Sequence, residues 1–252
     1  MSAHLTDPAA WQESWDLQQA AFMPDREHRI AAMLDAVEAV ADSPAPRVLD
    51  LAGGTGSIAL RALTRLPGAQ VTLVDVDPVL LAIAEASLTG RATIVTADLR
   101  DPAWADGLPH SDYDAVLAAT ALHWLPADRL ITLYGEIRAI LRPDGLLVNA
   151  DQMPDPLLPG LTKRLLARAD ACRVARYASG AAPTWPGWWE RAAADPVLGP
   201  LVEAREAIHP KGRSAEFLPP VAWHLDALRD AGFTEAGTLW RGGPDAAVAA
   251  IK

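Results

Sequence analysis

Residues 47–60 read RVLDLAGGTGSIAL, and this stretch decides the fold of the chain. An aliphatic run ends in Asp50, and a bend that contains Gly53, Gly54 and Gly56 follows it. Small residues let the backbone turn tightly and come close to a ligand. An apolar pattern at helical spacing begins after the bend, so the free N–H groups of a helix point into it. The stretch therefore predicts the first strand, cofactor loop and helix of a nucleotide-binding α/β sheet.

Composition and charge narrow the class of protein. The chain has 252 residues, half of them hydrophobic, which suits one α/β domain with an elaboration. Its net charge of −10 and pI near 5.0 disfavour nucleic acid and membrane surfaces as partners. The single cysteine, Cys172, excludes an internal disulfide and a multi-cysteine metal site, so no metal is expected. Residues 1–7 lack the features of a signal peptide, and a cytoplasmic location is expected.

Strand and helix patterns alternate along the first 151 residues. Strands are expected at 47–51, 70–75, 92–96, 113–118 and 145–150. Helices are expected between them at 57–66, 78–87, 102–105 and 126–141. Apolar strands that alternate with helices indicate a mostly parallel, Rossmann-like sheet with helices on both faces.

The remaining segments complete a single domain, 1–252, whose sheet we expect to have seven strands. Residues 1–43 are predicted to form an N-terminal helical lid, which Pro24 divides into two helices. The alternation stops after strand five, where 152–218 is predicted to be an inserted helical cap for the substrate, with helices at 157–177 and 186–207. A helix at 219–231 and a hairpin of strands at 233–240 and 245–251 follow, so the cofactor-binding core comprises 44–151 and 219–252.

Acidic residues follow three of the predicted strands. Asp50 ends the first, Asp75 ends the second 19 positions after Gly56, and Asp98 follows the third. Ligands of open α/β sheets bind beyond the carboxyl ends of the strands, where a carboxylate such as Asp75 accepts hydrogen bonds from a ribose diol. Asp98 stands where an adenine amino group needs an acceptor. Taken singly, Asp75 and Asp98 also suit helix caps.

These residues together resemble the class I S-adenosylmethionine-dependent methyltransferases. The resemblance begins with residues 48–56 and the spacing of Asp75 and Asp98. It continues with YDAVLAATALHW at 113–124, which is similar to the family's fourth motif, and LRPDGLL at 141–147, which is similar to the turn into its fifth strand. It spans about residues 45–151 and the last thirty. Ala52 departs from the glycine of many members, and a positive φ there would be strained.

The resemblance implies S-adenosyl-L-methionine as the cofactor and a site composed of Asp50, Gly53, Gly54, Gly56, Asp75, Val76, Asp98, Leu99 and Thr120. It implies that the glycines line the methionine part and that Asp75 holds the ribose hydroxyls. It also implies that Asp98 accepts from the adenine amino group beside the Leu99 amide, with Val76 and Leu99 on the adenine faces. Thr120 is then expected under the sulfonium, and Asp50 is expected to orient the loop or the methionine amino group.

Two other functions remain open at this point. The spacing Gly54-x-Gly56-x-x-Ala59 followed by Asp75 also matches the dinucleotide fingerprint of dehydrogenases. The helical segment of about 45 residues before the first strand, and Asp98, oppose that interpretation. A relative that keeps the cofactor only structurally, such as a binding module or a pericyclase-like enzyme, is the other alternative, because the signal for a catalytic base is weak.

Three residues are candidates for contact with the reacting groups. His123 follows the fourth strand and has a suitable pKa for a general base, or it only shapes the floor of the pocket. His209 in the cap is a second candidate. Asp151, at the end of strand five, is a candidate to touch substrate or a metal, or else it caps a turn.

Aromatic and basic residues complete the predicted site. Trp15, Trp124 and Trp185 are expected to wall the acceptor pocket, with ordinary packing as the alternative. Arg26 and Arg29 are placed to reach a cofactor carboxylate or are solvated helix charges. We therefore predict a methyltransferase that acts on a small-molecule acceptor at oxygen, nitrogen or carbon. Its N-terminal helices are candidates for a homodimer interface.

Overall fold

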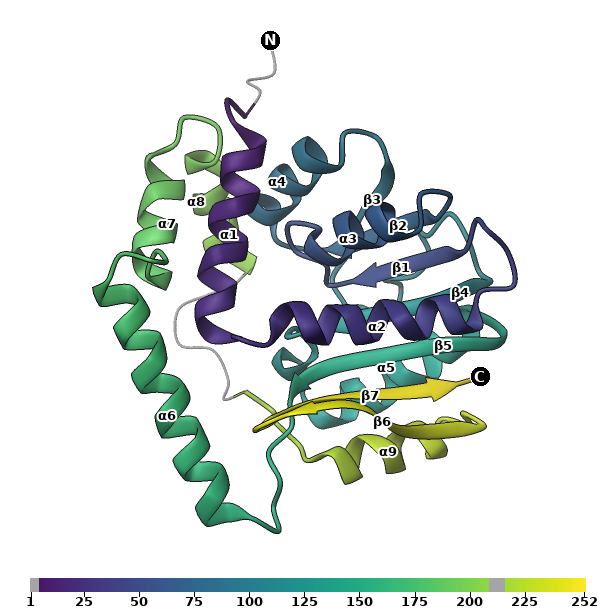
Figure 1. Cartoon of the computed structure of the whole chain (residues 1–252). Coiled ribbons are helices and arrows are strands. Elements are labelled where there is room, and N and C mark those ends of the chain that lie inside the picture. Colours follow the sequence, from purple (N-terminus) through teal and green to yellow (C-terminus); the bar gives the residue numbers. More distant parts are fainter. Residues whose placement is uncertain (1–4, 209–215) are drawn as a thin grey trace.

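A computed structural model describes residues 5–208 and 216–252, which form one seven-stranded sheet with helices on both faces (Figure 1). The strand order is β3-β2-β1-β4-β5-β7-β6. The strands are β1 Arg47–Leu51, β2 Gln70–Asp75, β3 Ala92–Thr96, β4 Tyr113–Ala119, β5 Leu141–Gln152, β6 Glu235–Gly242 and β7 Asp245–Ile251. The first five pair in parallel, whereas β7 is antiparallel to both β5 and β6. The predicted fold class is confirmed, and the antiparallel strand lies inside the sheet, one position from its edge.

Helices cover each face of the sheet. The helices are α1 Pro8–Phe22, α2 Arg26–Val40, α3 Ser57–Arg65, α4 Pro78–Leu88, α5 Ala127–Ile140, α6 Pro159–Ala178, α7 Trp185–Ala194, α8 Gly199–Ile208 and α9 Val221–Asp230. One apolar layer lies between the sheet and α2, α3 and α4, and a second lies between the sheet and α5 and α9. The central strands β1 and β4 are mostly apolar because both of their faces are buried, whereas β3 and β6 at the edges of the sheet are more exposed.

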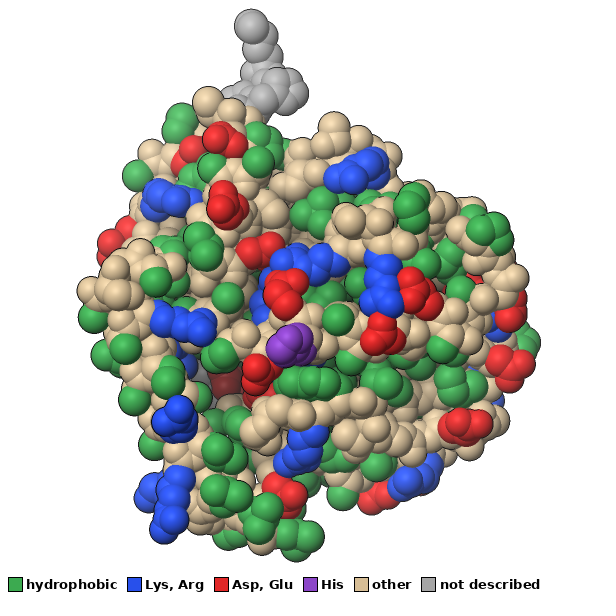
Figure 2. Space-filling model, viewed as in Figure 1, with side chains coloured by type: hydrophobic (Ala, Val, Ile, Leu, Met, Phe, Trp, Pro, Cys, Tyr) green, Lys and Arg blue, Asp and Glu red, His purple; other side chains and the backbone are tan. Residues whose placement is uncertain are grey.

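Ion pairs hold α2 against α3 on the face drawn in Figure 2, where acidic and basic side chains alternate near the middle of the view. Arg61 pairs with Glu27, and Arg65 pairs with Glu38. Pairing of this kind leaves little unbalanced charge over these two helices. It also fixes α3, and with it the glycine bend that precedes α3.

The helices of the N-terminal segment and the cap pack together beside the sheet (Figure 1). α1 contacts α4, α6 and α7, and α8 contacts α4 and α7. Trp11, Trp15 and Trp188 form a third apolar cluster there with residues of α4. No side chain of α6 is buried. Within the described part of the chain, no helix is long and apolar enough to cross a membrane.

Two predicted helices and one strand boundary were wrong. Residues 102–105 form turns, although Trp104 is buried and its indole N–H donates to Glu136. The predicted helix 186–207 is two helices, because Asp195 caps a turn before Pro196, which interrupts the helical hydrogen bonds. β5 begins at Leu141 rather than 145, and its first residues pair irregularly with β4.

Candidate cofactor and methyl-transfer site

The glycine bend after β1 uses left-handed backbone at alternate positions. Ala52, Gly54 and Gly56 have φ of 53°, 57° and 81°. The sequence predicted strain at Ala52 if its φ were positive, and its φ is positive. This left-handed conformation costs on the order of 1 kcal/mol in an L-residue. Gly56 also lacks room for a side chain, since a Cβ there would lie 3.0 Å from Leu88 and 3.2 Å from Leu73.

Asp50 and Gly53 pack directly against each other. A Cβ on Gly53 would lie 2.6 Å from the carboxyl carbon of Asp50, so only glycine fits. Asp50 is fully buried, and its Oδ2 accepts from the Ala59 N–H at 3.0 Å, at the start of α3. Its Oδ1 is buried with no hydrogen-bond partner among the described residues. Burial raises the pKa of Asp50 to about 7, partly offset by the Ala59 hydrogen bond.

Asp75 closes the bend from the neighbouring strand. Its Oδ2 accepts from the Gly54 N–H at 2.8 Å, and its Oδ1 accepts from the N–H groups of Val76 at 2.7 Å and Asp77 at 2.8 Å. Burial raises its pKa although these three N–H groups oppose the rise. Each carboxylate oxygen has two acceptor positions, so Oδ2 keeps one for a ribose hydroxyl.

Asp98 and Leu99 lie just beyond β3. The Nε of Arg100 donates to both carboxylate oxygens of Asp98, at 2.8 Å from each. The Asp98 side chain is 31% exposed. The Leu99 side chain is buried in the apolar layer between the sheet and α5. Its carbonyl oxygen accepts from Arg129 at 2.6 Å.

Arg26 and Arg29 are buried, so their interpretation as solvated helix charges was wrong. The Nη1 of Arg26 lies 3.0 Å from Asp16 of α1 in an ion pair, but it makes no hydrogen bond to any residue that the structure describes. The positive charge of Arg26 acts to lower the pKa of Asp50, so the two groups are within electrostatic reach of each other. Arg29 pairs with Asp245 at 2.5 Å and lies over the Trp240 ring.

α1 is attached to the cofactor loop by polar side chains. Gln12 donates to the Ser57 hydroxyl at 3.0 Å, and that hydroxyl donates to Asp16 at 2.6 Å. Ser57 is the first residue of α3. The N-terminal segment therefore contacts the glycine bend directly, a contact that the sequence pattern did not reveal.

His123 and Asp151 form a pair at the ends of β4 and β5. The Nδ1 of His123 lies 2.9 Å from both carboxylate oxygens of Asp151. The side chains are 13% and 5% exposed. Burial acts to lower the pKa of His123, but the hydrogen bond and charge of Asp151, with the charge of Glu216, outweigh it and raise the pKa. The sequence named both residues without predicting that they bond.

The backbone around this pair is fixed from several sides. Thr120 has a φ of 53°, its N–H donates to Ala150 at 2.8 Å and its hydroxyl donates to Ala119. The Phe217 N–H donates to the His123 carbonyl oxygen at 2.9 Å. A cavity of about 510 Å³, whose lining begins three residues after Asp151 in the sequence, is lined by Pro154, Asp155, Pro156, Pro159, Thr162, Lys163, Leu166, Leu218 and Pro220.

A second polar network beneath the pair was not predicted. Tyr134 receives a hydrogen bond from Asn149 at 3.1 Å and bonds His224 at 2.7 Å. Burial lowers the pKa of His224 to about 4, so its ring is neutral at neutral pH. The neutral ring then either accepts from the tyrosine hydroxyl at Nδ1 or donates to it from there, depending on its tautomer. The alternation of β5 places Asn149 and Asp151 on one face, which was the available signal.

The predicted aromatic residues fall in two places. Trp15 and Trp185 lie with ring centroids 5.9 Å apart in the cluster of α1 and α7. Trp124 is 49% exposed, and its ring lies 4.9 Å from the His123 ring. Among the described residues, no ring contact or hydrogen bond joins Trp15 or Trp185 to His123. His209 lies outside the described residues.

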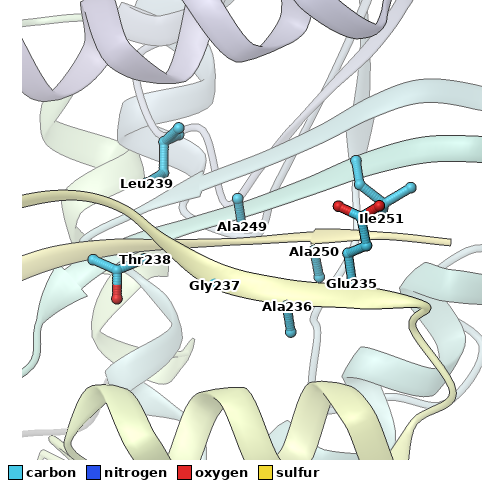
Figure 3. Close-up of a pocket in the computed structure, with 8 residues that line it drawn as sticks. All are labelled: Glu235, Ala236, Gly237, Thr238, Leu239, Ala249, Ala250 and Ile251. Carbon is cyan, nitrogen blue, oxygen red and sulfur yellow. The ribbon is translucent and has the colours of Figure 1, made fainter.

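A separate shallow cavity lies at the other edge of the sheet. It measures about 270 Å³ and is lined by β6 and β7, with Leu239 and Thr238 on opposite faces of β6 (Figure 3). It borders the start of β6 and the end of β7, whereas β1 to β5 present their carboxyl ends to the opposite side. This cavity is therefore distinct from the glycine bend.

The residues at the bend fit an adenosyl amino acid. Gly53 leaves a cradle that a Cβ would fill, and buried Asp50 offers an acceptor that lacks a donor. An α-ammonium group supplies such a donor, and Arg26 is a cation within reach of the same place. No group of three or more metal-binding side chains occurs in residues 5–208 and 216–252, so no metal site is found there.

Known proteins resemble the chain in the same region. A family described as "Methyltransferase domain" matches residues 48–145. A ubiquinone/menaquinone biosynthesis C-methyltransferase of Paracoccus denitrificans is 34% identical over 137 residues, which cover 50% of this chain and 52% of that protein. A demethylmenaquinone methyltransferase of Thermus thermophilus is 37% identical over 121 residues, which cover 48% and 54%. The chain thus spans about half the length of these curated relatives.

A solved structure extends the likeness to the whole fold. PigF, solved with SAH, superposes with a TM-score of 0.57 at 17% identity and covers 100% of this chain and 63% of its own. At this identity the match concerns the fold alone. Residues 48–145, which include the glycine bend, therefore resemble a methyltransferase domain in sequence, and the strand order and fold around them are similar to those of a protein solved with SAH.

Proposed function

We propose that this chain transfers a methyl group from S-adenosylmethionine to a small-molecule acceptor at the carboxyl edge of the sheet. The observation that carries the proposal is the unpartnered buried oxygen of Asp50 beside Gly53. A buried acceptor without a donor is costly unless a ligand supplies one. The ammonium group of the cofactor's methionine end has the required charge and donors.

Residues around the bend suit the rest of the cofactor. Arg26 suits the carboxylate of the methionine end, since its Nη1 makes no hydrogen bond to the described residues and only an ion pair with Asp16. Asp75 Oδ2 suits a ribose hydroxyl. Asp98 suits the adenine amino group, next to the Leu99 peptide and the Val76 side chain. For this role Asp98 would accept from the adenine in addition to, or in place of, the Arg100 guanidinium.

The bound cofactor supplies an electrophilic methyl group on a sulfonium, whose leaving group is neutral. The protein therefore contributes mainly by positioning the acceptor and excluding water. Residues 1–43 and 152–218 are proposed to form the lid and the substrate cap over the core, with Trp15 and Trp185 in their shared cluster. Thr120 is proposed to lie beneath the sulfonium.

The acceptor is proposed to be small and partly apolar. The net charge of −10 disfavours a nucleic acid acceptor. Two of the relatives carry names that refer to quinones, and the mostly apolar cavity whose lining begins at Pro154 suits an acceptor of that general character. A cytoplasmic location and a homodimer that uses the N-terminal helices remain part of this proposal.

Calorimetric titration with S-adenosylmethionine tests the proposal. We expect Asp75→Ala and Arg26→Gln to weaken binding about 10- to 100-fold, since each removes a charged hydrogen-bond partner worth roughly 1.5–3 kcal/mol. Arg229→Gln, which breaks only an exposed pair on α9, is the matched control and should bind like the parent. Binding of a nicotinamide dinucleotide in place of S-adenosylmethionine would overturn the proposal.

Transfer itself needs a second measurement. Incubation with methyl-labelled cofactor and a panel of phenols, amines and enolisable carbon acids should move the label to one class. Tight cofactor binding without transfer to any class would instead support a relative that keeps the cofactor structurally.

A further inference from the structure

We propose that the acceptor is a hydroxyl compound whose proton passes to Nε2 of His123, with Asp151 as the positioning residue. This inference rests on the proposed function and names the chemistry of its acceptor. It is carried by the bond between the two side chains at the ends of β4 and β5. The sulfonium leaving group is neutral, so a general base is useful only where the acceptor itself must lose a proton.

The partners of His123 determine its tautomer. A carboxylate only accepts hydrogen bonds, so Nδ1 must carry a proton to bond Asp151. In the neutral ring, Nε2 then holds the lone pair. No hydrogen bond to Nε2 comes from residues 5–208 or 216–252, and the ring keeps partial access to solvent. His123 therefore presents a basic nitrogen beside the position expected for the methyl group.

Asp151 is held so that this geometry persists. Its Oδ1 accepts the Gln152 N–H at 2.8 Å, and the side chain is nearly buried. Among the described residues, Asp151 on β5 and Glu216 are the charged groups whose fields act on His123. Both are negative, so both stabilise the imidazolium that forms when the ring accepts a proton.

The transfer step balances with these groups. The acceptor oxygen forms a bond to the methyl carbon while the carbon–sulfur bond breaks and its electron pair stays on sulfur. The hydroxyl proton moves to Nε2 of His123 and later to water. A neutral imidazole is a base of suitable strength for a phenolic or enolic hydroxyl near neutral pH. The apolar cavity that begins at Pro154 provides space for the carbon skeleton of such an acceptor.

Proton titration of the histidine ring by NMR tests the pair without any acceptor. We expect His123 to titrate above 6.5 in the parent and to shift down by about one pH unit in Asp151→Asn. His123→Gln assigns the signal, and His28→Gln, on the exposed face of α2, is the control. Circular dichroism verifies folding, and Asp151→Glu should restore part of the shift. A His123 that titrates at or below 6.5 and ignores Asp151→Asn overturns the inference.

Transfer assays then identify the acceptor class. With phenol and catechol as probes, Asp151→Asn should lower kcat about 10- to 100-fold, move the rising limb of the pH profile to lower pH, and leave cofactor affinity within twofold. Methylation of amines or carbon acids while both probes are refused contradicts the inference. Cofactor binding with no transfer to any class counts against the proposed function. The NMR titration then still tests whether Asp151 bonds His123 and raises its pKa.

Discussion

The ends of β1 and β5 each carry a buried aspartate, but the two carboxylates are satisfied differently. Asp50 has one oxygen bonded to a backbone N–H and one with no partner among the described residues, and burial raises its pKa to about 7. Asp151 bonds a histidine through both oxygens and a backbone N–H through one. The first is an incomplete site that a cationic ligand would complete. The second is complete within the chain, and its proposed role is to act through the histidine.

The surroundings of the two aspartates differ in the same way. The Asp50 end is built from local backbone: a bend of three glycines and the start of α3. The Asp151 end is built from side chains that meet from β5, α5, α9 and the short 3-10 helix Leu122–Trp124 that follows β4. Ligand binding should therefore be most sensitive to small backbone changes at the first end, and polar pairing most sensitive to side-chain changes at the second.

Gly53→Ala should break the first end most severely. The added methyl would lie 2.6–2.9 Å from the atoms of the Asp50 carboxyl group, which has nowhere to move. We expect a loss of about 3 kcal/mol in the free energy of unfolding and a drop of about 100-fold in cofactor affinity. Urea denaturation and calorimetry measure these. Gly135→Ala, in open space on α5, is the control and should stabilise by roughly 0.5–1 kcal/mol; equal behaviour of the two variants would contradict a tight cradle.

Asp50→Asn separates stability from ligand binding at the same end. The folded pKa of Asp50 is raised to about 7 from 3.8, so its ionisation costs stability progressively as pH rises from about 4 to 7. We expect the unliganded variant to gain about 2 kcal/mol over the parent at pH 8 and little at pH 4. Cofactor affinity should fall about 10-fold. Urea denaturation at the two pH values measures the difference in the free energy of unfolding between variant and parent. If that difference were the same at pH 4 and pH 8, ionisation of Asp50 would not be what destabilises the parent.

Tyr134→Phe probes the second end with a smaller effect. Removing the hydroxyl leaves Asn149 and His224 without their buried partner, which should cost about 1 kcal/mol. Tyr177→Phe is the matched control, because the Tyr177 hydroxyl makes no hydrogen bond to the described residues, and its cost should be near zero. Thermal unfolding compares the two variants. Similar losses in both would mean that the Tyr134 network does not stabilise this end.

Much of the fold was readable from periodicity. The apolar strands and the helices between them were predicted within a few residues at most boundaries, because both faces of the sheet are buried and the pattern is strong. The errors lie where local cues were ambiguous. Trp104 is buried from a series of turns, and Pro196 divides a pattern that is apolar on both sides.

The sequence by itself determined the β1–α3 bend, its glycines and the acidic residues that follow the strands, because each depends on neighbours a few positions away. The sequence also indicated that Ala52 would be strained if it adopted a positive φ, which it does. Only the tertiary structure decided that Asp151 bonds His123, 28 positions away, and that Arg26 is buried near Asp50. Such pairs depend on how strands align and helices pack, and a carboxylate at a strand end has the same sequence signature whether it meets a histidine, a ligand or water.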